Sequence, residues 1–148
     1  MSLDNLVLDK EKVISVVDKL RSIDMMPINK RLTVKYDTEY VGDLREETIR
    51  FLAISVVGEG RFTPSKRIDE YWHELVLNTP LYTNLSQRIG KFIHHEPSDK
   101  PETESYARTL NAYINTFGEP NSKYWKLSNA ADCESFCSSG ACEANCRD

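Results

Sequence analysis

Four cysteines lie close together near the C-terminus and are the first candidates for chemistry in this chain. They are spaced C-x3-C-x4-C-x3-C, at Cys133, Cys137, Cys142 and Cys146. The members of each outer pair are four residues apart, so their side chains would share one face of a helical turn. The Ser-Ser-Gly stretch at 138–140 can reverse the chain between the two turns. Folded in this way, the four sulfurs would converge.

Converging thiols suit two well-known chemistries. Four thiolates can bind zinc or an iron–sulfur cluster, so zinc or iron is the expected cofactor of such a site. Structural zinc sites more often use the tighter C-x2-C spacing, and the acidic residues Asp132, Glu134 and Glu143 lie beside these thiols. Alternatively, two disulfides would staple the segment, with the nested pairing Cys133–Cys146 and Cys137–Cys142 as one of three possible connectivities.

A third possibility is that the cysteine segment is a substrate. Residues 128–148 hold one large apolar residue, Phe136, so this segment should not fold alone without cross-links or a metal. We therefore place a boundary near Lys126, between a helical domain at 1–126 and a cysteine-rich tail at 127–148. This layout is similar to that of a ribosomally made precursor peptide, in which an enzyme recognises the leader and modifies thiols in the tail.

The histidines form the second candidate site, because all three lie between positions 73 and 95. Asp69 and His73 are four residues apart and would share a helix face, which suits metal ligands or an oriented imidazole. His94 or His95 can supply a third ligand, which gives the candidate metal set Asp69, His73 and His95. A purely structural role competes with this interpretation, since an Asp–His pair at this spacing often only hydrogen-bonds on a helix surface. The chain has no HExxH motif, nucleophile elbow or phosphate-binding glycine loop.

Apolar residues at spacings of three and four predict an all-α fold, a compact bundle of about five helices. The expected helices cover about residues 10–23, 43–57, 64–77, 80–89 and 101–117, with Thr63 as the N-cap of the third and Pro64 at its first position. The stretch from Asp24 to Asn29 contains Pro27 and reads as a loop. Residues 30–40 alternate like a strand but have no evident partner strand, so we favour a helix there. Tyr124 and Trp125 are expected to pack back onto the body.

Several uncommon residues appear in an order that resembles a known family. They are Phe51-Leu52, Pro64-Ser65, Asp69 with Trp72-His73, Thr79 with Tyr82, Phe92-Ile93-His94-His95 with Pro97, Tyr106, Tyr113, Phe117-Gly118 and Trp125. Over roughly residues 45–126 the chain resembles the glycine-rich domain-containing-protein-like family, a domain of unknown function. The resemblance implies an all-helical fold and no established activity. Many relatives have a histidine where this chain has Leu75, and a cysteine near Thr83–Leu85, which argues against a site with several histidines or a cysteine there.

The bulk composition restricts the partners. A net charge of −4 and a pI near 5.4 argue against a nucleic-acid groove and against an anionic membrane surface. No apolar run approaches the roughly 20 residues that span a bilayer, and the first ten residues do not read as a signal peptide. We therefore expect a cytoplasmic protein, in which disulfides are rare and clustered thiols more often bind metal, carry redox chemistry or are modified.

Three hypotheses follow for the function. We favour a non-enzymatic carrier or leader domain that docks to a protein partner, such as a modifying enzyme, and presents the four cysteines as a modifiable peptide or a metal or redox site. The second is a small metal-dependent enzyme, whose Asp69, His73 and His95 side chains would lie within about 4 Å of one another to share one ion. The third is a protein interaction module that uses exposed aromatic anchors such as Tyr71, Tyr124 or Trp125.

Overall fold

The computed structural model describes residues 6–95 and 103–126, and these residues fold into six packed α-helices with no strand among them. The helices are α1 (Lys10–Arg21), α2 (Met26–Leu32), α3 (Thr38–Val57), α4 (Lys66–Leu77), α5 (Thr79–Ile89) and α6 (Thr103–Phe117). The all-α prediction is therefore confirmed, with one helix more than expected. The cysteine segment lies outside the described residues.

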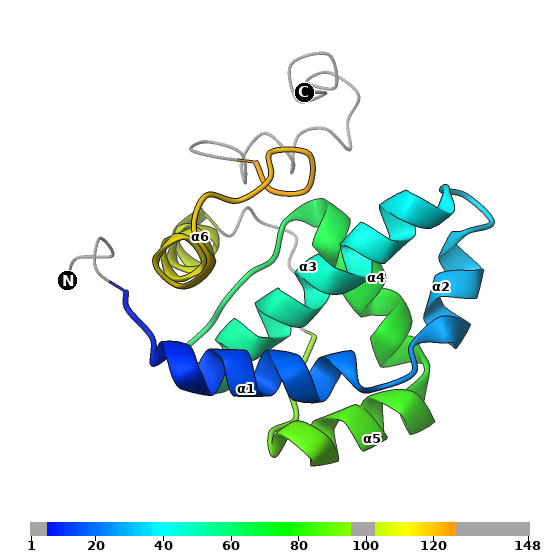
Figure 1. Cartoon of the computed structure of the whole chain (residues 1–148), viewed down its shortest axis with the longest axis horizontal. Coiled ribbons are helices and arrows are strands. Elements are labelled where there is room, and N and C mark those ends of the chain that lie inside the picture. Colours follow the sequence, from blue (N-terminus) through cyan, green and yellow to red (C-terminus); the bar gives the residue numbers. More distant parts are fainter. Residues whose placement is uncertain (1–5, 96–102, 127–148) are drawn as a thin grey trace.

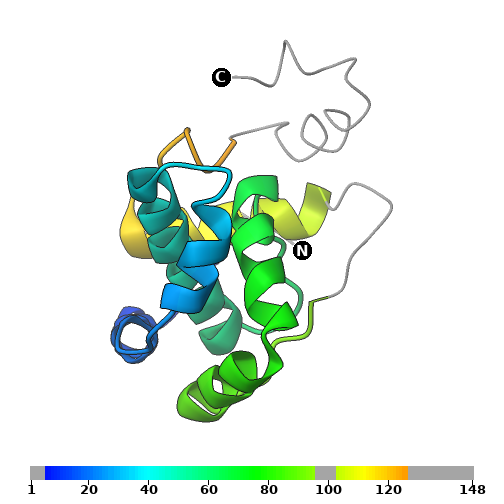
Figure 2. The ribbon, with the colours of Figure 1, turned by 90° about the vertical axis from the view of Figure 1, so that its right-hand side faces the viewer.

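The longest helix, α3, lies at the centre of the molecule. It contacts α1, α2, α4 and α6, while α5 packs against α1 and α4 below them (Figures 1 and 2). Its central position follows from its sequence, because Ile49 and the run from Phe51 to Ile54 are fully buried. A helix that is apolar on more than one face must be covered on more than one side.

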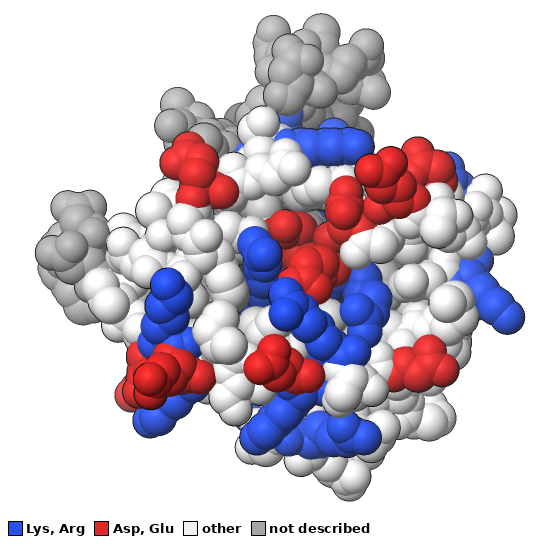
Figure 3. All heavy atoms as spheres, viewed as in Figure 1, with Lys and Arg blue, Asp and Glu red and all other residues white. Residues whose placement is uncertain are grey.

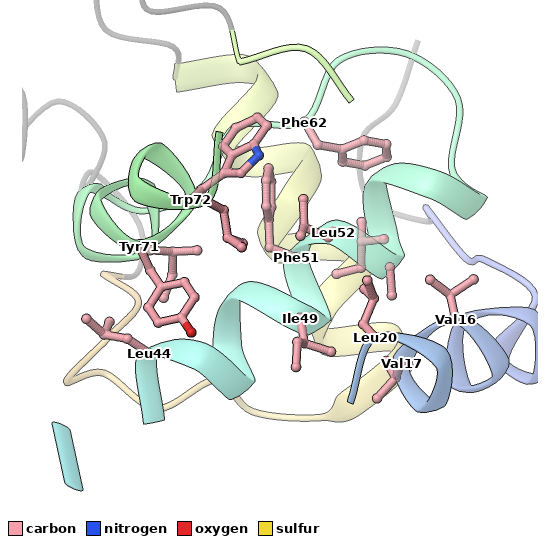
Figure 4. Close-up of a cluster of buried hydrophobic side chains, with 14 of the residues drawn as sticks. Val16, Val17, Leu20, Leu44, Ile49, Phe51, Leu52, Phe62, Tyr71 and Trp72 are labelled. Atoms are coloured by element: carbon pink, nitrogen blue, oxygen red, sulfur yellow. The ribbon is translucent and has the colours of Figure 1, made fainter. Parts of the chain in front are cut away.

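The core forms where α3 meets α1 and α4. Phe51 and Leu52 of α3 lie among side chains of both neighbours, with Leu20 approaching from α1 and Trp72 from α4 (Figure 4). The Phe51 and Trp72 rings meet edge to face, with their centroids 5.1 Å apart. Phe62, from the connection between α3 and α4, closes the cluster (Figure 4).

The predicted loop from Asp24 to Asn29 is wrong, because Met26 begins helix α2 there. Pro27 lies in the first turn of that helix, where its missing N–H has no partner to lose. Ile28 and Leu32, four residues apart, are both buried and form the apolar stripe of the helix. The proline thus begins a helix and does not interrupt one.

Only part of the predicted helix over residues 30–40 is found. Residues 33–37 form a turn, and α3 begins at Thr38, five residues before the predicted start at Asp43. The side chain of Asp37 accepts a hydrogen bond from the backbone N–H of Tyr40 at 2.8 Å and so caps α3. The turn leaves Val34 86% exposed, because no core surface lies beside it.

The N-cap of α4 is Ser65 and not the predicted Thr63. The Ser65 hydroxyl accepts from the backbone N–H of Ile68 at 3.2 Å. Thr63 instead contacts α6: its N–H donates to the Thr109 hydroxyl at 3.0 Å, and its hydroxyl lies 2.6 Å from that of Ser105. Thr63 therefore makes a tertiary contact with α6 in place of the local capping hydrogen bond that its residue type would also allow.

Acidic and basic side chains are interspersed on the face shown in Figure 3. Several ion pairs join helices that are distant in sequence, such as Arg31–Glu74 and Lys35–Glu70, each at 2.7 Å, which link the α2 region to α4.

None of the helices in the described part of the chain is long and apolar enough to cross a membrane.

Candidate functional site: the Asp69–His95 cluster and the C-terminal anchor

The connection between α4 and α5 brings the aromatic residues of the histidine motif together. Asn78 ends α4 and also caps α5, since its side chain accepts from the backbone N–H of Leu81 at 3.3 Å. With no loop between the helices, Trp72 of α4 reaches Tyr82 of α5, and the indole N–H donates to the phenol oxygen at 3.0 Å. The Tyr82 hydroxyl donates in turn to the carbonyl of Ile93 at 2.5 Å.

Burial of the Tyr82 ring raises the pKa of its hydroxyl, while the hydrogen bond from Trp72 acts in the opposite direction. The hydroxyl is therefore a neutral donor at physiological pH. It links α4, α5 and the segment that follows α5, at Ile93. This arrangement positions the next residues, His94 and His95.

His95 pairs with Asp69. Its Nε2 lies 2.8 Å from a carboxylate oxygen of Asp69, and its ring meets that of Trp72 edge to face with centroids 4.7 Å apart. The His95 side chain is 11% exposed and that of Asp69 is 45% exposed, so the imidazole is covered while its partner faces solvent. A carboxylate that holds one ring nitrogen fixes the orientation of an imidazole.

The other two histidines lie nearby but are exposed. The ring of His73 has its centroid 5.5 Å from that of His95, and the ring of His94 lies against Phe92 with centroids 4.9 Å apart. The hydrogen bond of Asp69 is made with His95, which is 26 residues away, and not with His73 on its own helix. Within residues 6–95 and 103–126, no three His, Cys, Asp or Glu side chains are grouped so that they could hold a metal ion.

A second cluster fixes the C-terminal end of the described chain. Trp125 is fully buried, and its indole N–H donates to Oε1 of Glu47 in α3 at 2.8 Å. The hydroxyl of Tyr113 donates to the same oxygen at 2.6 Å, and Arg50 Nη1 donates to the Tyr113 hydroxyl at 2.8 Å. Burial and the neighbouring Glu47 both raise the pKa of Tyr113, which keeps its proton on this hydrogen bond.

Two further hydrogen bonds hold the residues beside Trp125. The Tyr124 hydroxyl donates to Asp43 at 2.7 Å, and the Tyr106 hydroxyl of α6 donates to the carbonyl of Lys126 at 2.7 Å. The chain is thus attached to α3 and α6 as far as its last described residue before the cysteine segment (Figure 1). We call Glu47, Tyr106, Tyr113, Tyr124 and Trp125 the C-terminal anchor.

The anchor confirms that Tyr124 and Trp125 pack back onto the body. The same burial contradicts their predicted use as exposed aromatic anchors for a partner, since Tyr71, Tyr124 and Trp125 are at most 2% exposed. Tyr71 instead donates its hydroxyl proton to Asn29 of α2 at 2.5 Å. These large amphipathic rings stabilise the interior of the fold.

Comparison with known proteins adds no further assignment: no family model, no curated protein and no solved structure matches the chain. The resemblance to the glycine-rich domain-containing-protein-like family therefore stays a prediction. The four cysteines, Cys133, Cys137, Cys142 and Cys146, lie outside the described residues, so their convergence also stays a prediction.

Proposed function

We propose that the helical domain at 1–126 is a non-enzymatic carrier or leader domain that holds the four-cysteine segment at a fixed point and presents its thiols to a protein partner. The observation that supports this most directly is the C-terminal anchor. Four aromatic side chains and one buried carboxylate attach the chain immediately before residue 127. Buried Tyr and Trp hydrogen bonds of this kind position a chain end far more firmly than an ordinary terminus.

The density of thiols supports a dedicated role for the presented segment. All four cysteines of the chain fall among its last 16 residues. Exposed thiols oxidise and cross-link, so a cluster of them without a function would be a liability. We propose that these thiols are either modified by an enzyme or bind zinc or iron. Modification would change the mass of the chain covalently, whereas bound metal would be lost on denaturation.

Intact mass measurement of protein from its own host, with thiols trapped at lysis, tests the proposal. A covalent mass shift within Cys133–Cys146 is expected if the segment is modified. A shift present in native spectra and lost on denaturation is expected if it binds metal, and a Cys133→Ser, Cys137→Ser variant would then lose it. An unmodified mass with four free thiols and no metal would contradict the carrier proposal.

The metal-dependent enzyme is the weaker alternative: Asp69 pairs with His95 and the His73 ring lies near that of His95, but in the described residues these three side chains are not grouped as a metal site. The native mass experiment separates this alternative from the carrier. Metal bound through the histidine cluster would be lost in a His73→Ala, His95→Ala variant and kept in the double serine variant of the cysteines. A His94→Ala variant is the matched control, because the His94 ring lies against Phe92, whereas Asp69 pairs with His95.

A further inference from the structure

Two asparagines of α6 hold the main chain of Leu6, a residue more than a hundred positions away in the sequence. Asn111 Oδ1 accepts a hydrogen bond from the backbone N–H of Leu6 at 3.0 Å. Asn115 Nδ2 donates to the backbone carbonyl of Leu6 at 3.0 Å and to Asn111 Oδ1 at 2.9 Å. Both polar main-chain groups of one residue are thus satisfied by side chains, and the two side chains also support each other.

The segment held by this pair has the form of a bound extended peptide. Leu6 and Leu8 are partly buried and pack against the core, whereas Val7 between them is 68% exposed. This alternation is that of an extended chain, in which successive side chains point to opposite sides. In Figure 1 the segment runs from the neighbourhood of α6 to the start of α1 and belongs to no helix.

The contacts recognise main chain and apolar side chains, not a particular sequence. Asn111 and Asn115 contact atoms that every residue except proline provides. The side-chain requirement is for apolar groups at alternate positions. In the described part of the chain, two hydrogen bonds of Leu6 and two half-buried side chains hold the segment. An attachment of this size is of the kind that opens locally while a core stays folded.

We propose that Asn111, Asn115 and the apolar surface beneath Leu6 and Leu8 form a binding site for an extended peptide of a partner protein, with apolar residues at alternate positions. The chain's own segment Leu6–Leu8 occupies this site in cis. A partner peptide must therefore compete with a tethered ligand, whose effective concentration is in the millimolar range for a short connection. This proposal does not depend on the cysteine segment and goes beyond the carrier function.

The test uses the full chain and a labelled peptide with the sequence of residues 3–10. In a Leu6→Ser, Leu8→Ser variant the tethered ligand is weakened and the asparagine pair is intact. Fluorescence anisotropy should show that this variant binds the peptide at least about tenfold more tightly than the wild-type chain does. Equal affinity for the two chains would overturn the proposal.

A variant of the asparagines, with a matched control, and a modified peptide test the role of Asn111 and Asn115. Adding Asn111→Ala and Asn115→Ala to the serine variant should lower the affinity by at least about tenfold, whereas Asn84→Ala, on the exposed side of α5, should not change it. A peptide N-methylated at Leu6 lacks the proton that Asn111 accepts. It should bind the serine variant no better than the unmethylated peptide binds the chain with the added alanines. Full binding of the methylated peptide would contradict the proposed contact.

A measurement on the wild-type chain covers the case in which the serine variant does not fold. Saturating peptide should displace the tethered segment and speed the hydrogen exchange of the Leu6 amide, while core amides of α3 keep their protection. An unchanged Leu6 exchange rate at saturating peptide would overturn the proposal without any variant.

Discussion

Glu47 is a residue of α3 on which two segments distant in sequence converge. It lies in the middle of α3 and accepts hydrogen bonds from Tyr113 of α6 and from Trp125 beyond α6, which are 66 and 78 residues away. A carboxylate this deep is tolerated only when donors replace the water it has lost. The network around Glu47 therefore ties the last described residues to the central helix.

Removing the Tyr113 hydroxyl should weaken this network without leaving a hole in the core. Tyr113→Phe deprives Glu47 of one of its two donors and Arg50 of its acceptor, so we expect the free energy of unfolding to fall by about 1–3 kcal/mol. Urea denaturation at pH 7 measures the change. Tyr36→Phe is the control, because its hydroxyl bonds to Glu70 near the surface, and its loss should be the smaller of the two. Equal losses would mean that burial adds nothing to the Tyr113 hydrogen bond.

The sequence contains a sign of this network, because Glu47 falls on the buried face of α3 together with Leu44, Thr48 and Phe51. It contains no sign of the donors, since hydrogen bonds over more than sixty residues leave no local pattern. The same limit applies to His95. Spacing on one helix predicts Asp69 beside His73, but the tertiary path of the chain after α5 delivers His95 to the carboxylate instead.

At the level of helices, two glycines should respond to alanine in opposite ways. Gly90 ends α5 in the left-handed conformation with φ +79°, so Gly90→Ala should destabilise the fold by about 1 kcal/mol. Gly42 lies within α3 on an exposed face with open space around it, so Gly42→Ala should stabilise the fold by about 0.5–1 kcal/mol. Thermal unfolding monitored by circular dichroism distinguishes the two. A shift of the same sign in both variants would contradict this assignment of the backbone.

Helices with strong apolar spacing could be predicted from the sequence, while helix starts could not be predicted wherever two residues competed for one role. The predicted start of α1 at Lys10 agrees with the structure, because Asp9 is the only capping residue beside a clear apolar stripe. The predicted start of α4 at Pro64 differs from the observed start at Lys66, because Thr63 and Ser65 are both good caps. The spacing does not predict the start of helix α2, because the helix has seven residues, too few for the periodicity to stand out against its proline.

For the molecule as a whole, buried tyrosines should make the fold sensitive to alkaline pH. Burial raises the pKa of Tyr71, Tyr82 and Tyr113 above the ordinary tyrosine value of about 10. Below that value these tyrosines are neutral in both the folded and the unfolded chain, so their contribution to stability is fully present. Above it they ionise first in the unfolded chain, so stability is lost as the pH rises, by up to about 1.4 kcal/mol per pH unit for each tyrosine.

Urea denaturation between pH 8 and pH 11.5 checks this prediction. The free energy of unfolding should decline from about pH 10 upward, and the decline should be shallower in Tyr113→Phe, which has one tyrosine fewer to titrate. A wild-type curve with the same slope as the variant would show that Tyr113 ionises equally easily in both states.

The two tryptophans of the chain lie in separate clusters, and each is buried with its indole N–H donated to a partner. Trp72 is in contact with Phe51, Tyr82 and His95. Trp125 is in contact with the other members of the C-terminal anchor, Tyr106, Tyr113 and Glu47 among them. The fluorescence of each tryptophan therefore reports on a different cluster of the protein. In a Trp72→Phe chain the remaining emission would report only on the attachment of the C-terminal end, and in a Trp125→Phe chain only on the histidine cluster, so partner binding at either place becomes visible without an added dye.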